Sequence, residues 1–480
     1  MQNLRARTVK ALLWNLTGLG GKLVSQLLIQ VCLARLLSPE DFGLMAMLMV
    51  VTSVGLVFVE GGFGIALIHN KDALREDESS VFYCNLGLAM VAYGVLWFIA
   101  PWVADFYGQS SLELLLRFSA IGLLLSAIGL VQNSILSRQL DFKSISIVNL
   151  VSSVLAGGIA IAMAWRGHGV WSLAWQFVLT SAFRSILLWL VSSWRPLFTF
   201  RIEAIRQMGA YGSRIVVSQL ISTLFENINQ ILIGKFYSAS ALGYYSRALT
   251  IQSIPANTFS QAVGGVLLPA FVHLNGQPDE FRKGYRRAIS CSAAVVIPMM
   301  AILGLLAKPI FLLIFSEKWL PAVPYFQIFC LTGMLYPLHL LNMNALLALG
   351  KTDLYLRIEI IKKVVALCCA AVALPLGVIA FANSTLIMSI ICLIINTHYT
   401  HKLVNYGFWG QFRDIIPFIA SASIALPLAW LSIGFAGEKP WLQIVVGGAS
   451  MVFIYLIVSW LSSRDTYQFI FRSMLHSRLP

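Results

Sequence analysis

Long apolar runs recur along this chain of 480 residues and constrain its fold more than any other feature. A helix needs about 20 apolar residues to cross the hydrocarbon core of a bilayer, where only helices and closed barrels satisfy their backbone hydrogen bonds. We count fourteen such runs, at residues 12–34, 43–65, 81–103, 114–136, 145–165, 170–192, 215–234, 243–270, 288–314, 322–348, 355–376, 382–401, 415–434 and 441–461. The sequence therefore predicts an all-α integral membrane protein with about 14 transmembrane helices.

The composition excludes a soluble protein. Hydrophobic residues make up 58% of the chain and charged residues 11%, whereas a soluble domain carries about 25% charged residues. The seven cysteines all lie in apolar runs and show no metal-ligand spacing. The sequence contains no Walker A motif, so it encodes no ATPase. We expect a secondary transporter rather than an enzyme, with no cofactor and no metal site.

Basic residues lie in short clusters between the apolar runs and predict the orientation of the chain. Lys and Arg number 34 against 20 Asp and Glu, which gives a net charge of +14. One continuous basic patch would indicate a nucleic-acid partner, but these clusters follow the alternation of the spans. With fourteen spans, 22 Lys and Arg fall on one side when Arg357 at the edge of its span is included, five fall on the other side and seven lie deeper within the spans. By the positive-inside rule, we expect both termini in the cytoplasm, and no nucleic acid as a partner.

Three basic segments outside the spans are amphipathic. They are residues 195–214, 277–288 and 464–478. Apolar residues mixed with Lys and Arg favour a position along the cytoplasmic leaflet, where anionic lipid attracts the basic groups. Membrane lipid is therefore an expected partner of the chain.

The chain contains an internal repeat. QVCLARLLSPEDFGLMA at 30–46 matches QILIGKFYSASALGYYS at 230–246 with an offset of 200 and no gap. The aligned positions include Gln30 with Gln230, Ser38 with Ser238, and Gly43 with Gly243. Further along, NSILSRQLDFKS at 133–144 resembles NALLALGKTDLY at 344–355 with an offset of 211. Aligned glycines and polar residues in equivalent places indicate a duplication rather than a chance likeness of apolar segments.

The repeat predicts how the chain is divided. Two six-helix bundles are expected at residues 1–194 and 215–403, joined by a cytoplasmic amphipathic linker at 195–214. Because six spans return to the starting side, the two bundles have parallel topology. Residues 404–480 are expected to add two transmembrane helices and a cytoplasmic tail. Transporters built from repeats place their substrate site at the interface of the repeats.

Polar residues within two spans predict a cavity between the bundles. Two sets are spaced along one helical face, namely Lys22, Gln26 and Gln30 in the first span and Gln219, Glu226 and Gln230 in the seventh. Polar side chains in spans normally face the protein interior or a water-filled cavity. The offset of 200 superposes Gln26 on Glu226, so the two sets are expected to face each other, with Lys22 opposite Glu226.

Charged residues in other spans are further candidates. Arg184, Arg247 and Lys362 are predicted to line the substrate cavity, and Glu60, Glu226 and Glu359 to carry a coupling proton or sodium ion. A charge at the bilayer centre costs about 2.5–3.5 kcal/mol on insertion scales, which argues for a role. A cavity rich in cations suits an anionic substrate such as a pyrophosphate. A structural ion pair is the alternative for Lys22, Arg184 and Glu226, and snorkelling to the membrane surface is the alternative for Arg247, Glu359 and Lys362.

Three stretches carry a family resemblance, ARLLSPEDFGLMAMLMVVTSV at 34–54, EGGFGIALIHNKD at 60–72 and IGKFYSASALGYYSRA at 233–248. They resemble the polysaccharide transporters of the multidrug/oligosaccharidyl-lipid/polysaccharide (MOP) exporter superfamily, in particular the colanic-acid exporter and O-antigen flippase type, over most of residues 1–405. The resemblance implies a bacterial inner-membrane protein that works by alternating access. Its implied substrate is an undecaprenyl-pyrophosphate-linked oligosaccharide, flipped from the cytoplasmic to the periplasmic leaflet during surface polysaccharide biosynthesis. Polysaccharide polymerase and export machinery are implied as further partners.

Other functions stay open at this point. A proton- or sodium-coupled multidrug exporter and a lipid II flippase have the same kind of topology. A scaffold without transport activity in a polysaccharide assembly complex is a third alternative. A membrane-bound glycosyl-polymerising enzyme is disfavoured, because such enzymes usually carry a sizeable periplasmic loop and all outer loops here are short. The sugar composition of a substrate cannot be read from these residues.

Overall fold

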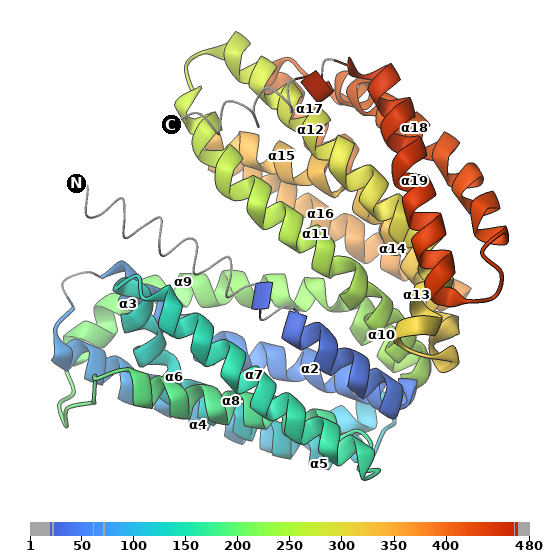
Figure 1. Ribbon diagram of the computed structural model, residues 1–480. Helices are drawn as coiled ribbons and strands as arrows, with labels where there is room; N and C mark the ends of the chain where they lie inside the picture. Colours follow the sequence, from blue (N-terminus) through green and yellow to red (C-terminus); the bar gives the residue numbers. More distant parts are fainter. Residues whose placement is uncertain (1–19, 22–23, 61, 71–72, 465, 469–480) are drawn as a thin grey trace. The chain divides into compact units, whose positions relative to one another are not determined.

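The computed structural model describes residues 20–21, 24–60, 62–70, 73–464 and 466–468. Throughout these residues the regular elements are helices, and the part of the chain that is described contains no strand (Figure 1). The chain divides into two compact units, and the boundary falls between Gly243 and Tyr244. An all-helical fold is what the apolar runs predict, because a helix satisfies its own backbone hydrogen bonds in lipid.

Helix α6 lies at the centre of the first unit. The helices of this unit are Val24–Leu36, α2 (Pro39–Glu60), α3 (Phe63–His69), α4 (Arg75–Tyr107), α5 (Ser111–Ser119), α6 (Ile121–Arg138), α7 (Phe142–Trp165), α8 (Trp171–Val191), α9 (Ile202–Glu226) and α10 (Ile228–Phe236). Helix α6 packs against α2, α3, α4, α7 and α8, and α7 runs beside α8 (Figure 1). Side chains on α6 are therefore brought close to residues from several helices of this unit.

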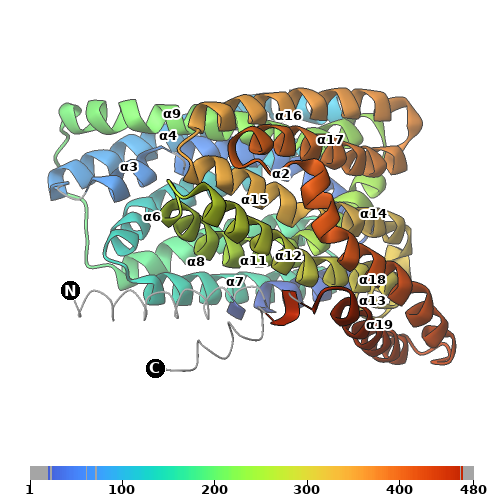
Figure 2. The same cartoon turned by 90° about the horizontal axis from the view of Figure 1, so that it is seen from above.

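Helix α12 has the same central role in the second unit. The elements are α11 (Ala239–His273, which begins in the first unit), α12 (Pro278–Leu305), α13 (Ala307–Ile314), the 3₁₀ turn Glu317–Ala322, α14 (Val323–Met334), α15 (Tyr336–Ala348), α16 (Thr352–Ala373), the 3₁₀ turn Leu374–Leu376, α17 (Val378–Val404), α18 (Phe408–Gly434) and α19 (Pro440–Ser462). Helix α12 packs against α14, α15, α17, α18 and α19. Helices α15, α16 and α17 lie side by side (Figure 2).

The two C-terminal helices share the core of the second unit. Phe281 and Tyr285 of α12 belong to one buried cluster with Phe418 of α18 and with Met451 and Tyr455 of α19. The Tyr455 hydroxyl also donates a hydrogen bond of 3.1 Å to the carbonyl oxygen of Ala294 in α12. Residues 404–480, which the sequence predicts as an addition to the second bundle, thus supply part of its packing.

Nine helices in the described residues are long and apolar enough to cross a membrane. They are Pro39–His69, Arg75–Tyr107, Ser111–Arg138, Phe142–Trp165, Trp171–Val191, Pro278–Leu305, Val378–Val404, Phe408–Gly434 and Pro440–Ser462. Each coincides with a predicted span. Large apolar side chains such as Phe98, Trp102 and Leu190 are at least 70% exposed, a surface that suits lipid rather than water. The chain is therefore a multi-pass membrane protein.

The other five predicted spans lie outside this set, so the count of fourteen stays a prediction. Span 12–34 falls partly outside the described residues. Span 215–234 is interrupted between α9 and α10, and span 322–348 between α14 and α15. Spans 243–270 and 355–376 form the long helices α11 and α16, which are not among the nine. These five spans also carry most of the candidate residues named from the sequence.

Two of the three predicted surface segments are continuous with a long helix. Residues 278–288 form the beginning of α12, and their position along the cytoplasmic leaflet stays a prediction. Pro278 at the helix start and Asp279 and Glu280 in its first turn favour a helix beginning there, which then continues into the apolar run. Residues 202–214 likewise belong to α9. Segment 464–478 lies mostly outside the described residues.

The internal repeat has a structural counterpart at the start of α2 and α11. The Ser38 hydroxyl oxygen accepts a hydrogen bond of 3.2 Å from the backbone N–H of Asp41, and the Ser238 oxygen accepts one of 3.1 Å from that of Ala241. Both serines therefore cap their helices in the same way, at positions that the offset of 200 aligns.

The aligned glycines lie where the first turns of α2 and α11 touch. A Cβ atom at Gly43 would overlap the carbonyl oxygen of Ala239, and one at Gly243 would overlap that of Pro39. The contact is reciprocal between residues that the offset of 200 makes equivalent. Only glycine lets the two backbones approach this closely.

The second repeat match is also visible, but its predicted offset of 211 is wrong by one residue. Leu140 and Gly350 have positive φ angles of 60° and 69° at the ends of α6 and α15. The N–H of Asp141 bonds to the oxygen of Leu136 and that of Lys351 to the oxygen of Leu346, each at 2.9 Å. Both helices thus end in the same left-handed cap, and the backbone aligns them at an offset of 210.

Candidate functional site

Charged and polar side chains meet in a small hollow inside the first unit. Arg184 of α8, Glu60 at the end of α2 and Asn133 of α6 border a hollow of about 150 Å³. The Arg184 Nη1 atom lies 3.9 Å from Glu60 Oε1, and Arg184 Nη2 donates a hydrogen bond of 3.3 Å to Asn133 Oδ1. Four serine hydroxyls complete the polar lining, those of Ser126, Ser134, Ser181 and Ser185. We call this group the Arg184 pocket.

The Arg184 guanidinium can bind a further anionic group. Its contact with Glu60 is long, and the side chains of Arg184 and Glu60 are 34% and 42% exposed. Its buried Nε atom has no hydrogen-bond partner among the described residues. A guanidinium presents five N–H donors in a planar fork that matches carboxylate and phosphate oxygens. The pocket can therefore hold an anion against Arg184 while Glu60 limits the net charge.

The sequence names Arg184 and Glu60 separately, and the structure brings them together. Asn133 is a polar neighbour that the sequence reasoning did not identify. Its signal is present, because Ser126 and Asn133 are seven residues apart in the apolar run 114–136 and so share one face of the helix. The prediction assigned Glu60 to ion coupling and Arg184 to the substrate, and their proximity links these two roles.

The polar stretch in the seventh predicted span contains a helix break. Helix α9 ends at Glu226, Asn227 has φ −97° and ψ 1°, and α10 begins at Ile228. The Asn227 side-chain amide donates a hydrogen bond of 2.8 Å to the Thr223 carbonyl oxygen and receives one of 3.3 Å from Gln230 Nε2. Asparagine competes for backbone hydrogen bonds, which disfavours a continuous helix. The predicted span 215–234 is therefore divided into α9 and α10 at Asn227.

The two predicted polar faces are only partly described. Lys22 lies outside the described residues, so its pairing with Glu226 stays a prediction. In the helix Val24–Leu36, Gln26 is exposed and Gln30 is half-buried. On the other face Gln219 and Gln230 are half-buried and Glu226 is exposed.

A second polar group lies inside the second unit. Lys362 Nζ lies 2.8 Å from Glu359 Oε1 one turn earlier in α16, and the Lys362 side chain is only 13% exposed. On α15, the His339 ring is held from both sides, by Ser389 Oγ at 2.9 Å and by the Asn396 amide at 3.1 Å. The structure thus pairs Glu359 with Lys362, two candidates to which the sequence assigned different roles.

Arg247 occupies a packed position in the second unit. It is buried, with its guanidinium 5.9 Å from the centre of the Trp319 ring. A cation over an aromatic face is stabilised even when it is removed from water. Arg247 is not among the residues that line the Arg184 pocket. No group of three or more His, Cys, Asp or Glu in the described residues could hold a metal ion.

Comparison with solved structures identifies the fold. The lipid II flippase MurJ, in an inward closed conformation, superposes with a TM-score of 0.77 over 95% of this chain and 99% of MurJ, at 17% identity. An inward-facing multidrug resistance MATE family transporter of the MOP superfamily gives a TM-score of 0.61 over 79% of this chain and 94% of the transporter, at 16% identity. The chain therefore shares the fold of these two transporters.

Sequence comparison gives the family. Residues 32–324 match the family model described as "Polysaccharide biosynthesis protein", and the chain belongs to this family. The succinoglycan biosynthesis transport protein ExoT of Rhizobium meliloti is 28% identical over 90% of this chain and 88% of its own length. The teichuronic acid biosynthesis protein TuaB of Bacillus subtilis is 30% identical, and the match spans 62% of each chain. The lipopolysaccharide biosynthesis protein WzxC of Escherichia coli is 21% identical over 75% of this chain and 74% of its own.

Proposed function

We propose that this protein is a flippase that moves a lipid-linked oligosaccharide repeat unit across the bacterial inner membrane during the biosynthesis of a surface polysaccharide. The proposed carrier is undecaprenyl pyrophosphate, and the proposed direction is from the cytoplasmic to the periplasmic leaflet. Both termini then lie in the cytoplasm, in accord with the split of 22 against five basic residues. Transport proceeds by alternating access and is coupled to a proton or a sodium ion.

Family membership over residues 32–324 is the observation that carries this proposal. The relatives support it, since their names assign them to teichuronic acid, succinoglycan and lipopolysaccharide biosynthesis. The Arg184 pocket adds a chemical argument, because its guanidinium suits the pyrophosphate of such a carrier. Glu60 beside it is the group that we assign to ion coupling, since a carboxylate can exchange a proton or sodium ion for its contact with Arg184.

A clean deletion of the gene tests the class of function. We expect loss of one surface polysaccharide and accumulation of its lipid-linked repeat unit in the cytoplasmic leaflet, measured by lipid extraction and mass spectrometry. A deletion strain with normal polysaccharide would contradict the proposal. Loss of cationic dye efflux from that strain would instead favour a multidrug exporter.

Complementation of the deletion strain tests the Arg184 pocket. Arg184→Ala should lower polysaccharide export about tenfold to a hundredfold, because a charged hydrogen bond contributes about 1.5–3 kcal/mol. Arg184→Lys keeps the charge but loses the planar fork, so it should restore only part of the export. Arg117→Ala is a matched control, since Arg117 forms an ion pair of 2.8 Å with Glu113 one turn away and borders no hollow described here. Unchanged export with a normal protein level in Arg184→Ala would favour a scaffold without transport activity.

Substitution of the candidate carboxylates tests ion coupling. In vesicles carrying a proton or sodium gradient, Glu60→Gln should make export insensitive to the gradient, because glutamine cannot exchange a proton or bind sodium with a charge. Glu226→Gln and Glu359→Gln distinguish the other two candidates by the same measurement. If all three variants keep the wild-type gradient dependence, coupling does not pass through these residues.

A further inference from the structure

A large basic hollow lies in the second unit, apart from every residue assigned to transport above. It has a volume of about 850 Å³ and is bordered by the N-terminal turns of α12 and α18 and by the end of α19. Five cations and one carboxylate line it, Lys283, Arg286, Arg287, Arg413, Arg464 and Asp414. We call it the α12–α18–α19 basic pocket. Such an excess of positive charge in a concave site attracts an anion.

The single carboxylate of this pocket is already engaged. Asp414 accepts two hydrogen bonds from the Arg286 guanidinium, one of them 2.6 Å long between Nη2 and Oδ1. It also accepts a hydrogen bond from the Tyr406 hydroxyl. Burial, together with this bond to Asp414, raises the pKa of Tyr406 above its usual value, so the hydroxyl stays protonated and keeps donating. Asp414 therefore fixes Arg286 and joins α12 to α18.

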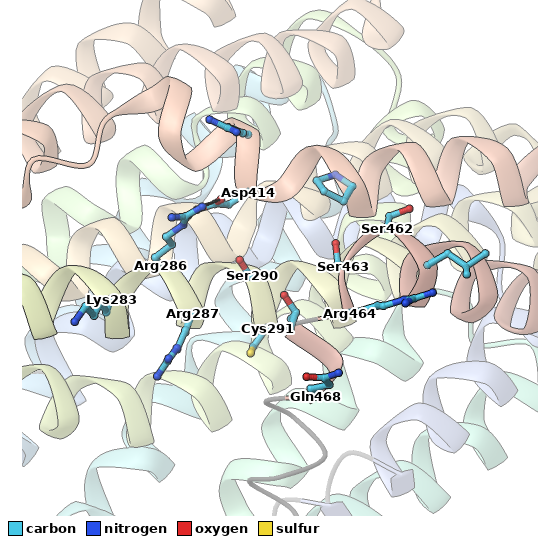
Figure 3. Close-up of a pocket in the computed structure, with 14 residues that line it drawn as sticks. Lys283, Arg286, Arg287, Ser290, Cys291, Asp414, Ser462, Ser463, Arg464 and Gln468 are labelled. Carbon is cyan, nitrogen blue, oxygen red and sulfur yellow. Dashed lines mark hydrogen bonds and ion pairs between the residues drawn. The ribbon is translucent and has the colours of Figure 1, made fainter.

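Neutral donors lie between the basic groups. Figure 3 shows Ser290 and Ser463 between the Arg286–Asp414 pair on one side and Arg464 on the other. Hydroxyl groups donate to phosphate oxygens, and guanidinium groups bind them in pairs. Arg464 is itself positioned, since its guanidinium lies 5.0 Å from the centre of the Trp460 ring. The combination of arginines and hydroxyls fits a phosphate group.

The pocket lies at the level of a membrane surface. Helices α12, α18 and α19 are three of the nine membrane-length helices, and the pocket residues come from one end of each. Trp409 and Trp460, at the same ends of α18 and α19, are 78% and 49% exposed. Exposed tryptophans at helix ends mark the interface between lipid and water. The cluster of Lys and Arg predicts that this end is the cytoplasmic one.

An apolar surface continues from the pocket along α19. Phe453, Leu456 and Leu461 of this helix are 68%, 48% and 57% exposed, and Leu461 also borders the pocket. A ligand whose phosphate sits among the arginines can thus lay an acyl chain along α19 without leaving the bilayer. A soluble phosphate would make no use of this surface.

We propose that the α12–α18–α19 basic pocket binds the phosphate headgroup of an anionic phospholipid of the cytoplasmic leaflet. The acyl chains lie along the exposed face of α19, and the bound lipid joins the ends of three helices. This inference is independent of the proposed transport function, because it uses none of the residues of the Arg184 pocket.

Lipid binding to the purified full-length protein in detergent tests this proposal. Native mass spectrometry with added phosphatidylglycerol, phosphatidylcholine or inorganic pyrophosphate measures the three affinities separately. The triple variant Arg287→Gln, Arg413→Gln, Arg464→Gln keeps the Arg286–Asp414 pair and should bind phosphatidylglycerol about a hundredfold more weakly, from the usual contribution of each basic residue near a lipid surface. Phosphatidylcholine binding should stay unchanged in this variant, because its headgroup carries no net charge.

A control with the same loss of charge is available in the first unit. Arg35, Arg166 and Lys235 are all exposed and lie outside the three basic amphipathic segments, and the triple variant with Gln at these positions should bind phosphatidylglycerol within about twofold of wild type, because no built pocket is removed. Equal losses in the two triple variants would show attraction by overall charge and overturn the proposal. Pyrophosphate that binds as tightly as phosphatidylglycerol would also overturn it, in favour of a soluble phosphate.

A single substitution protects the test against misfolding of the triple variant. Arg413 is exposed in the first turns of α18, so Arg413→Gln should fold normally. It should weaken phosphatidylglycerol binding about fivefold, the share of one basic residue near a lipid surface. Unchanged binding by Arg413→Gln would contradict the proposal.

Discussion

The two copies of the internal repeat differ far less in their helix caps and turns than in the polar residues of their interiors. Ser38 and Ser238 cap α2 and α11 alike, and the ends of α6 and α15 share one left-handed turn. At the offset of 210, however, Asn133 of the Arg184 pocket corresponds to Met343, and His339 corresponds to Gly129. The repeats thus share the residues that set backbone geometry and differ in those that supply interior chemistry.

This comparison teaches where each kind of residue is constrained. A cap or a close backbone contact has a local physical requirement that few residue types meet, so both copies use the same solution. The residue types of polar groups inside a bundle are instead constrained by the side chains that they contact on other helices. Glu359 and Lys362 of the second unit form an ion pair, whereas Asn149 and Ser152 stand at the corresponding places in the first.

The reciprocal glycine contact should be the most sensitive shared feature. Gly43→Ala and Gly243→Ala should each lower the free energy of unfolding by about 3 kcal/mol, because the new methyl group overlaps a backbone carbonyl that cannot rotate away. Gly158→Ala is the control, since nothing lies within 4 Å of a Cβ atom there and alanine favours a helix. Thermal and denaturant unfolding in detergent measure the change. A large loss for only one of the two glycines would break the symmetry of the contact.

Removal of a buried amide side chain should destabilise the second unit more than the first. Asn342 and Gln132 occupy equivalent positions at the offset of 210 and are both fully buried. The Asn342 side chain exchanges hydrogen bonds of 2.9 and 3.1 Å with buried Gln411, so Asn342→Leu should cost about 2 kcal/mol by leaving Gln411 without that partner. Gln132→Leu should cost less, because the Trp189 indole still donates to the Ile128 carbonyl oxygen at 2.9 Å. Equal costs in unfolding experiments would show that the two interiors are equivalent after all.

The two capping serines should have matching, moderate effects. Ser38→Ala and Ser238→Ala should each lower the free energy of unfolding by about 1 kcal/mol, the usual contribution of an N-cap side chain. Ser110 precedes α5 without a side-chain cap hydrogen bond, so Ser110→Ala should change little. The same unfolding measurements compare the three variants. A Ser110→Ala loss as large as the other two would remove the capping explanation.

The shared turn should respond to substitution with opposite signs in the two units. Leu140 has a positive φ and is 43% exposed, so Leu140→Gly should raise the free energy of unfolding by up to about 1 kcal/mol through relief of backbone strain. Gly350→Ala should lower it by about 1 kcal/mol, because nothing but the positive φ disfavours a side chain there. Two changes of the same sign would mean that tertiary contacts, rather than backbone conformation, control this turn.

Much of the fold could be predicted from particular residues. Nine of the predicted spans coincide with membrane-length helices, because the length of an apolar run can be compared directly with the thickness of the bilayer core. The repeat was found from pairs such as Gly43 and Gly243, since capping and close approach leave a sequence signal. The break at Asn227 could not be predicted, because a polar residue in an apolar run can face a cavity, bond to a neighbouring helix or interrupt its own helix. The one-residue error in the second offset arose because the turn is set by φ, which allows leucine in one copy and glycine in the other.

The sequence by itself determined that this protein is a helical membrane protein with a duplicated architecture, because hydrophobicity, charge asymmetry and helix caps act locally along the chain. It also identified Arg184 and Glu60 as charged residues in predicted spans, where the cost of burying a charge in the membrane indicates a role. Only the tertiary structure decided that they meet each other and Asn133, three residues from helices far apart in the sequence. The rotation of each helix about its axis depends on packing against neighbours, so the partners of a buried charge are fixed only when the helices assemble.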